Sequence, residues 1–136
     1  MMDTYMADRR RTRRPQVVVV ADDFEGLRQL WHICLSQSGF EVLEASTGEE
    51  ALHVATRHRP AAVVMDLAMP VMDGLEATRR LKQDPRTADV PIVMVTAHTS
   101  PEHRRAAEDA GCAAFLHKPT DFEDLIAELR RVLTSA

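Results

Sequence analysis

The sequence predicts an α/β domain in which a five-stranded parallel sheet carries helices on both faces. Two observations lead to this fold class. Short, continuous apolar runs, such as residues 17–21 and 92–96, alternate with stretches of helical length whose apolar residues recur every three or four positions. The alternation repeats five times, and right-handed crossovers between parallel strands cover both faces of one sheet. The pattern does not fix the order of the strands.

Each strand is predicted from a short run rich in apolar and β-branched residues, bounded by turn or capping residues. Runs without polar alternation indicate strands that are buried on both faces. In chain order the predicted strands cover residues 17–21, 41–45, 61–66, 92–96 and 113–117.

The helices are predicted from their apolar spacing and from residues that begin or end a helix. Thr47 with Glu50 and Thr120 with Glu123 have the spacing of a capping box. Gly39 follows the first helix as a left-handed cap. In chain order the predicted helices cover residues 24–38, 48–58, 75–83 and 101–110, and a last segment from Phe122 to Leu133.

Size and composition are those of one folded domain. The chain has 136 residues, 45% hydrophobic and 28% charged, and a formal net charge of −4, which argues against a general nucleic-acid binder. Its apolar runs fall short of the roughly 18 residues of a membrane span, so we expect no membrane association and a cytoplasmic location. Cys34 and Cys112 form no CxxC pair, which favours free thiols in a reducing compartment.

The N-terminal segment differs from the rest of the chain. Residues 1–15 contain five arginines, all between Arg9 and Arg14, and show no apolar period. This composition predicts a basic, disordered arm before a folded domain at residues 16–136. Arginines without a folded reader attract nucleic acid only non-specifically, so we expect no specific nucleic-acid partner.

Residues with reactive side chains fall at the carboxyl ends of the predicted strands, the edge where open parallel sheets bind ligands. Carboxylates crowded there repel one another unless a cation joins them, and magnesium suits a small site with few carboxylates. A lysine on the same edge can neutralise a phosphoryl group carried by a carboxylate. These residues are Asp22 and Asp23 after the first strand, Asp66 and Thr96 ending the third and fourth, and Lys118 after the fifth.

Taken one at a time, these residues have simpler interpretations. An Asp pair after a strand is commonly a helix cap, and a single Asp or Thr there is commonly a cap or turn residue. A Lys-Pro pair is commonly part of a plain loop. Their combination on one edge is what favours a single phosphoryl-accepting pocket.

With these motifs the sequence resembles the receiver domain of bacterial response regulators, single-domain chemotaxis regulators included. The resemblance covers about residues 17–133 and implies a flavodoxin-like receiver fold. It rests on the pairs Asp22-Asp23, Thr96-Ala97 and Lys118-Pro119, and on the segment VVMDLAMPVMDG at residues 63–74.

The resemblance implies that Asp66 takes a phosphoryl group from a phosphohistidine on a histidine kinase or a histidine phosphotransfer protein. The chain is then a signalling module, and its only catalysis is its own phosphorylation and dephosphorylation. Asp23, Asp66 and the backbone carbonyl of Ala68 are implied as direct Mg2+ ligands, with Asp22 acting mainly through water. Lys118 is implied to contact the phosphoryl oxygens.

A switch is implied as well. Thr96, followed by Ala97, moves to hydrogen-bond the phosphoryl group, and the aromatic residue of the last strand, here Phe115, turns inward. A tyrosine often stands at that position, so any contact of its hydroxyl is absent here. A plain core role fits Phe115 equally well. The implied loop-shaping residues are Pro70, Asp73, Gly74 and Pro119, whose bond to Lys118 is usually cis in the family.

Two positions bear on the lifetime of the phosphorylated state. Ala68 lies two residues after Asp66 and His98 two after Thr96, and both flank the route of an attacking water. Because Ala68 cannot orient that water, we predict that self-dephosphorylation depends more on His98. A plain exposed loop residue is the simpler interpretation of His98.

Two other functions are compatible with parts of the sequence pattern. An aspartyl-phosphate phosphohydrolase also uses a strand-end Asp and magnesium, but normally has a second Asp where this chain has Ala68. A flavin- or nucleotide-binding flavodoxin-like module needs a first loop that accepts phosphate, whereas Asp22 and Asp23 repel one.

The output is expected to run through protein contacts. No helix-turn-helix pattern follows Leu133, so we expect an unknown downstream protein to read a surface of the domain. In receiver domains of response regulators this surface is commonly formed by the fourth helix, the fifth strand and the fifth helix. We expect a monomer or a weak homodimer.

Overall fold

The computed structural model describes residues 14–134, so most of the predicted arm at residues 1–15 lies outside the described residues. Within the described range five strands form one parallel sheet with the order β2-β1-β3-β4-β5. The strands are β1 (Val17–Ala21), β2 (Glu41–Ala45), β3 (Ala62–Met65), β4 (Ile92–Thr96) and β5 (Ala114–His117).

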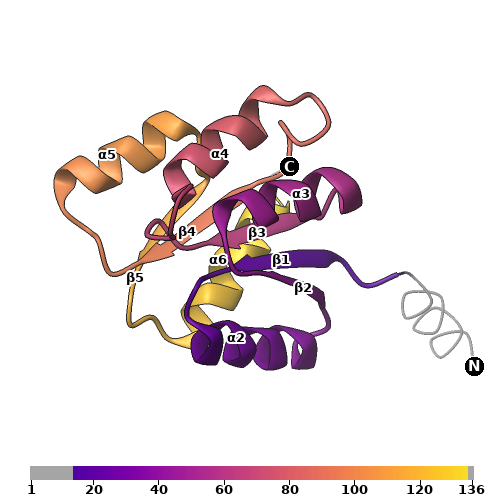
Figure 1. The fold of residues 1–136 in the computed structure, drawn as a ribbon. Coiled ribbons are helices and arrows are strands. Elements are labelled where there is room, and N and C mark those ends of the chain that lie inside the picture. The colour runs from indigo at the N-terminus through magenta and orange to yellow at the C-terminus, as the bar shows by residue number, and fades with distance from the viewer. Residues whose placement is uncertain (1–13, 135–136) are drawn as a thin grey trace, which may run out of the picture.

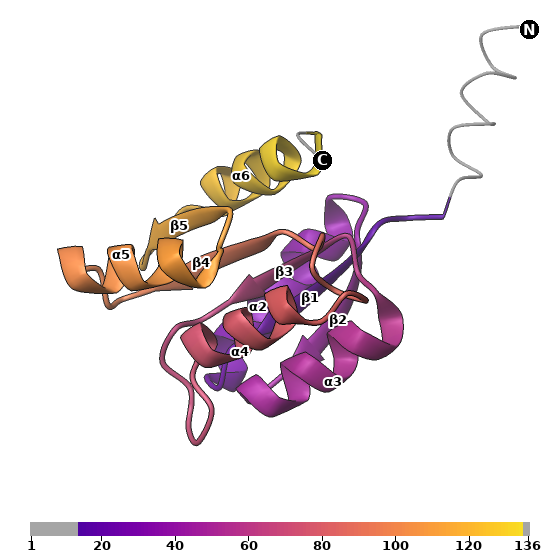
Figure 2. The ribbon, with the colours of Figure 1, turned by 90° about the horizontal axis from the view of Figure 1, so that it is seen from above.

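Five helices of the described range cover the two faces of the sheet. Figure 1 shows α3, α4 and α5 on one face and α2 and α6 on the other, and Figure 2 shows α3 and α4 side by side. The helices are α2 (Glu25–Gln37), α3 (Gly48–His58), α4 (Gly74–Gln83), α5 (Pro101–Ala110) and α6 (Phe122–Thr134). Among residues 14–134 no helix has the length and apolarity to cross a membrane.

A separate hydrophobic core lies on each face of the sheet. Val19 packs with the α3–α5 side, whereas Val18 and Val20 pack with the α2 and α6 side, because successive strand side chains point to opposite faces. All three valines are at most 1% exposed. Burying such a side chain stabilises the fold by about 1.5–3 kcal/mol. Because both faces of the strand are buried, apolar residues occupy consecutive positions along it.

Most predicted element ends agree with the structure to within one residue. The hydroxyl of Thr47 caps α3 by accepting the Glu50 N–H at 3.0 Å, as predicted. The Glu50 carboxylate accepts from the Ser46 N–H, one residue before the capping residue. The cap predicted at Thr120 is wrong by one residue, because α6 begins at Phe122 and its first helical carbonyl belongs to Asp121.

The strand order determines where the loops lead. β1 has β2 on one side and β3 on the other, so the chain leaves the carboxyl edge of β1 and β3 in different directions. A crevice for ligands forms where the strand order reverses in this way. Ala21 pairs with Met65 in the register of β1 and β3, which sets Asp22 and Asp66 next to each other at that edge.

Candidate functional site

Three carboxylates converge at the carboxyl edge of β1 and β3. One oxygen from each of Asp22, Asp23 and Asp66 lies within 4.8 Å of the others. Asp22 and Asp66 are only 3% and 8% exposed, whereas Asp23 is exposed. The donor set consists of hard oxygen atoms only, which suits a divalent cation of the magnesium kind.

Lys118, directly after β5, bridges the two buried carboxylates. Its Nζ donates to Asp22 Oδ2 at 2.6 Å and to Asp66 Oδ2 at 2.9 Å. Burial lowers the pKa of this ammonium, but the hydrogen bonds and charges of Asp22 and Asp66 raise it by more, so the pKa lies above its ordinary value of 10.5. Lys118 therefore supplies a fixed positive charge to the pocket.

Backbone N–H groups orient the same two carboxylates. The Phe24 N–H donates to Asp22 Oδ1 at 2.9 Å, and the Ala68 N–H donates to Asp66 Oδ1 at 3.2 Å. Each buried carboxylate thus accepts from one backbone N–H and one ammonium hydrogen. Hydrogen bonds to ionised groups are stronger than neutral ones, so the two side chains have defined orientations.

The loop after Asp66 closes tightly against it. The Gly74 N–H donates to the Leu67 carbonyl at 2.7 Å, and a Cβ added to Gly74 would collide with the Asp66 carbonyl oxygen. Asp73 caps α4 by accepting the Glu76 N–H at 2.9 Å. Only glycine fits at position 74, and this close backbone contact fixes where α4 starts relative to the pocket.

The tip of this loop, in contrast, is open. Pro70 is exposed, and its carbonyl accepts the Met72 N–H at 2.8 Å. Val71 is fully exposed with a φ of 67°, an uncommon conformation for a β-branched residue.

Thr96 ends β4 and is 0% exposed. Its Oγ1 accepts the His98 N–H at 3.1 Å, while Ala97 and His98 themselves are exposed. The His98 ring lies 5.5 Å from the ring of His103 on α5. The predicted cis bond between Lys118 and Pro119 is present.

Phe115 lies on β5, half-buried, on the same face of the sheet as Thr96. The register pairs Thr96 with His117, two residues after Phe115, and side chains two apart on a strand share a face. The Arg104 guanidinium of α5 lies 4.8 Å from the centroid of the Phe115 ring. The aromatic residue is thus held between the core and a cation.

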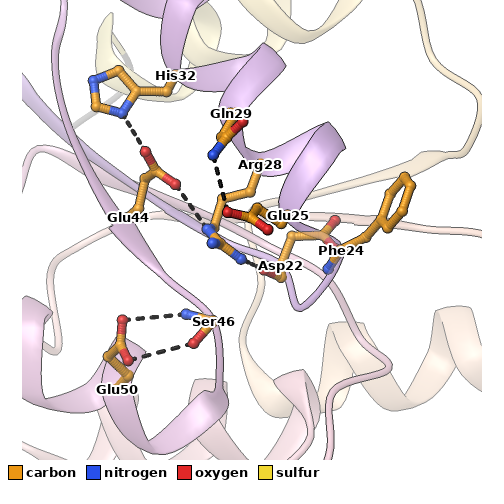
Figure 3. A network of polar contacts seen from close by, with 9 residues as sticks. All are labelled: Asp22, Phe24, Glu25, Arg28, Gln29, His32, Glu44, Ser46 and Glu50. Atoms are coloured by element: carbon orange, nitrogen blue, oxygen red, sulfur yellow. Dashed lines mark hydrogen bonds and ion pairs between the residues drawn. The ribbon is translucent and has the colours of Figure 1, made fainter.

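One set of contacts was missed by the sequence reasoning. Arg28 of α2 donates to the backbone carbonyl of Asp22 at 2.9 Å and to Glu44 of β2 at 2.8 Å (Figure 3). The only sequence signal is that Arg28 lies on the first turns of the helix that follows the acidic pair. Its partner Glu44 comes from a different element and has no fixed spacing to it.

The profile of the response regulator receiver domain matches residues 18–130 of this chain. The chain belongs to this family. It is therefore a receiver domain of a two-component system, with the flavodoxin-like receiver fold that the sequence predicts. The family consists of signalling modules, in contrast to the two alternatives, phosphohydrolases and flavin- or nucleotide-binding modules.

Curated relatives are themselves response regulators. Response regulator MprA from Mycobacterium sp. strain KMS is 40% identical over 119 residues, which make up 88% of this chain and 51% of MprA. Polar-differentiation response regulator DivK from Brucella anthropi is 31% identical over 122 residues, which make up 90% of this chain and 99% of DivK. This receiver domain therefore spans about half the length of MprA and nearly all of DivK.

Solved structures show the same fold. Chemotaxis protein CheY4 of Vibrio cholerae has a TM-score of 0.83 at 34% identity, covering 87% of this chain and 98% of CheY4. The receiver domain of sensor histidine kinase PA1611 from Pseudomonas aeruginosa PAO1 also has a TM-score of 0.83, at 28% identity, covering 88% of this chain and 98% of that domain. That structure holds a magnesium ion in its active site cleft.

Proposed function

We propose that Asp66 is the phosphoacceptor of this receiver domain and takes its phosphoryl group from a phosphohistidine on a histidine kinase or a histidine phosphotransfer protein. This proposal rests on the position of the Asp66 carboxylate. It lies at the ligand-binding edge of the sheet, 2.9 Å from the Lys118 ammonium and beside two further carboxylates. Asp66 thus combines a nucleophilic oxygen with groups that bind phosphoryl charge.

The acidic pocket fits Mg2+. Three carboxylates face one ammonium, so the pocket carries excess negative charge that a divalent cation would neutralise. Asp23, Asp66 and the Ala68 carbonyl would bind it directly and Asp22 mainly through water. The magnesium ion in the active site cleft of the PA1611 receiver domain supports Mg2+ as the cation. When bound, Mg2+ supplies charge neutralisation for the phosphoryl oxygens.

The transfer itself needs little covalent chemistry from the protein. An Asp66 carboxylate oxygen forms the new P–O bond as the P–N bond of the phosphohistidine breaks, and the electron pair stays on the imidazole nitrogen. Lys118 already contacts Asp66 Oδ2 and is placed to follow that charge onto the phosphoryl oxygens. Catalysis then consists mainly of positioning and electrostatic stabilisation.

Thr96 is suited to report the phosphoryl group. Its Oγ1 is the acceptor in the bond with the His98 N–H, so the hydroxyl proton is left to donate to a phosphoryl oxygen. Movement of Thr96 and the following Ala97 would open space on the face that Phe115 shares, and Phe115 would turn inward. Such a switch needs contacts that differ between the two states.

We assign the lifetime of the phosphorylated state to His98 rather than Ala68. The Ala68 methyl group cannot hydrogen-bond an attacking water, whereas the exposed His98 ring can. A His98→Ala substitution should change the phosphoryl lifetime, and His53→Ala, an exposed histidine on α3, is its control. Equal lifetimes for the parent and His98→Ala contradict this assignment.

An apolar groove beside the site suits the approach of the phosphohistidine partner. The groove, of about 510 Å³, opens between α2 and the loop after β5 and reaches Lys118. Leu30 lines it and is 52% exposed, so an apolar side chain of the groove is open to a partner. Leu30→Ser should therefore slow transfer from a phosphohistidine protein and leave labelling by the small donor acetyl phosphate unchanged. Slowing of both, or of neither, argues against this role.

We also propose how the domain passes on its signal and where it works. The output surface would be α5, β5 and α6, read by a downstream protein, with the domain a monomer or weak homodimer. The free thiols of Cys34 and Cys112 support a reducing, cytoplasmic location.

Intact mass spectrometry tests the proposed function. The parent and Asp66→Asn are incubated with acetyl phosphate, with Mg2+ or with EDTA. We expect one acid-labile phosphoryl group on the parent only, and only with Mg2+. A parent that gains none contradicts the proposal.

A further inference from the structure

A chain of charged groups runs from the acidic pocket along one face of α2 to Glu44 of β2. We call the three residues Arg28, Glu44 and His32 the Arg28 network (Figure 3). Arg28 Nη1 donates to the Asp22 carbonyl at 2.9 Å, Arg28 Nε donates to Glu44 Oε1 at 2.8 Å, and Glu44 Oε2 lies 2.7 Å from His32 Nδ1. The network thus joins β1, α2 and β2.

The geometry of Arg28 makes this link stiff. A guanidinium presents its donors in a fixed planar fork, so binding Glu44 with one nitrogen fixes where another nitrogen meets Asp22. The Arg28 side chain is 15% exposed, which limits screening by water. His32 engages the second Glu44 oxygen, so both oxygens of this carboxylate are engaged.

The group that Arg28 holds is the peptide between Asp22 and Asp23. Its carbonyl accepts from Arg28, and the peptide on the other side of Asp22 is fixed as well, because the Asp22 N–H donates to the Ala45 carbonyl at 3.1 Å. The two peptide groups that flank Asp22 are therefore both bonded to the end of β2, one directly to Ala45 and one through Arg28 to Glu44. The direction in which the chain continues into Asp23 follows from these bonds.

Asp23 is the pocket carboxylate most dependent on such support. Lys118 binds Asp22 and Asp66, whereas Asp23 is exposed at the rim of the pocket. Its carboxylate position is thus set mainly by its backbone, which the Arg28 network orients.

We propose that Arg28, supported by Glu44 and His32, is a positioning residue that holds the Asp22–Asp23 peptide so that the carboxylates are arranged for a divalent cation before it binds. The proposal rests on the Mg2+ site of the proposed function. Residues outside the metal-binding groups that orient them change metal affinity by about 10- to 100-fold when substituted. A tether that only stabilises the fold, in contrast, changes unfolding and leaves the affinity of the folded protein unaltered.

Calorimetric titration with MgCl2 separates these two roles. We expect Arg28→Met to bind Mg2+ about 10-fold more weakly than the parent while folded. Arg28→Lys should recover only part of the affinity, because one ammonium cannot reproduce the planar fork. Glu44→Gln should weaken binding less than Arg28→Met, because the Arg28 bond to Asp22 remains. The control is Arg80→Met, which removes a 3.0 Å ion pair with Glu76 on α4, outside the pocket.

Amide hydrogen exchange gives a second readout without metal. In Arg28→Met the peptide covering residues 22–24 should exchange faster than in the parent, and in Arg80→Met it should not. If Arg28→Met fails to fold, Glu44→Gln carries the test with the same two measurements.

The Mg2+ affinities of the parent and of Arg28→Met show whether the metal site fails or only the positioning role. A parent that binds no Mg2+ overturns the proposed metal site and the positioning role with it. A parent that binds Mg2+, with folded Arg28→Met binding within twofold of it, overturns the positioning role alone.

Discussion

The Lys118 ammonium binds the Asp22 carboxylate at 2.6 Å, although Lys118 follows β5 and Asp22 follows β1, and β3 and β4 lie between these two strands in the sheet. The same ammonium binds Asp66 at 2.9 Å. In this state Lys118 therefore already has two carboxylate partners, and an arriving phosphoryl group would compete with them for it. The ion pairs hold the pocket together, and their exchange is part of the proposed reaction.

Removing Lys118 should leave two buried carboxylates without their counter-charge. We expect Lys118→Met to lower the free energy of unfolding by about 1.5–3 kcal/mol, the range for hydrogen bonds to charged groups, and Mg2+ to restore part of it. Urea unfolding at neutral pH, with and without MgCl2, measures both effects. Arg86→Met, which removes an exposed ion pair with Asp84, is the control and should change little. An unchanged Lys118→Met stability contradicts the prediction.

Two glycines should respond to alanine with opposite signs. Gly74→Ala places a Cβ against the Asp66 carbonyl oxygen and should destabilise the fold by about 1–3 kcal/mol. Gly26 lies within α2, and a Cβ added there meets only the Phe24 ring, at 3.7 Å. Gly26→Ala should therefore stabilise the fold by about 0.5–1 kcal/mol. Urea unfolding of both variants tests the pair. Equal effects would mean that the close approach at Gly74 does not constrain the loop.

Protonation of the Glu44 carboxylate in acid should lower the free energy of unfolding. Burial raises its pKa, but hydrogen bonds and charges of Arg28 and His32 lower it by more, to below its ordinary 4.5. A carboxyl whose pKa is depressed on folding contributes stability that is present above its unfolded pKa and lost as the pH falls through its folded pKa. Above pH 4.5 the parent should be more stable than Glu44→Gln, and this difference should vanish below the folded pKa.

Urea midpoints between neutral pH and pH 3 measure this difference. Glu41→Gln, an exposed carboxylate on the same strand, should run parallel to the parent. A Glu44→Gln curve that also runs parallel to the parent would show that the Arg28 network does not favour the ionised carboxylate.

Arg104 should oppose the inward turn of Phe115. Its guanidinium lies 4.8 Å from the ring centroid, and such a contact at an exposed site is worth about 0.5–1 kcal/mol. Arg104→Met should therefore raise the ratio of inward to outward ring about two- to five-fold at a given level of activation. Fluorine NMR of fluorophenylalanine-labelled protein, titrated with beryllium fluoride and Mg2+, measures the two populations.

Arg105→Met, an exposed neighbour on the same helix, is the control for this experiment. Equal populations in the parent and Arg104→Met would show that the cation does not bias the ring.

The elements were predictable because each depends on local pattern. Val18, Val19 and Val20 form one buried run, whatever strands lie beside them, and Thr47 caps α3 through a bond three residues away. The strand order was not predictable, because every order satisfies the same apolar runs.

Strand ends alone predict at which edge of the sheet the site lies, but not which of its side chains touch. Asp66 and Lys118 could be assigned to one rim from strand ends alone, but the Lys118 bond to Asp22 depends on the strand order and on side-chain direction. Arg28 and Glu44 meet only after α2 packs on β2, so no sequence spacing marks them. The motion of Thr96 and Phe115 concerns a second state and stays a prediction.

Locating the phosphoryl group on the chain tests most directly whether Asp66 is the phosphoacceptor. The parent is labelled with acetyl phosphate and Mg2+, reduced with borohydride, which converts an aspartyl phosphate to homoserine, and digested for peptide mass spectrometry. We expect homoserine at position 66 in the parent and none in Asp66→Asn. Homoserine at Asp22 or Asp23 instead, or at no aspartate, would contradict it.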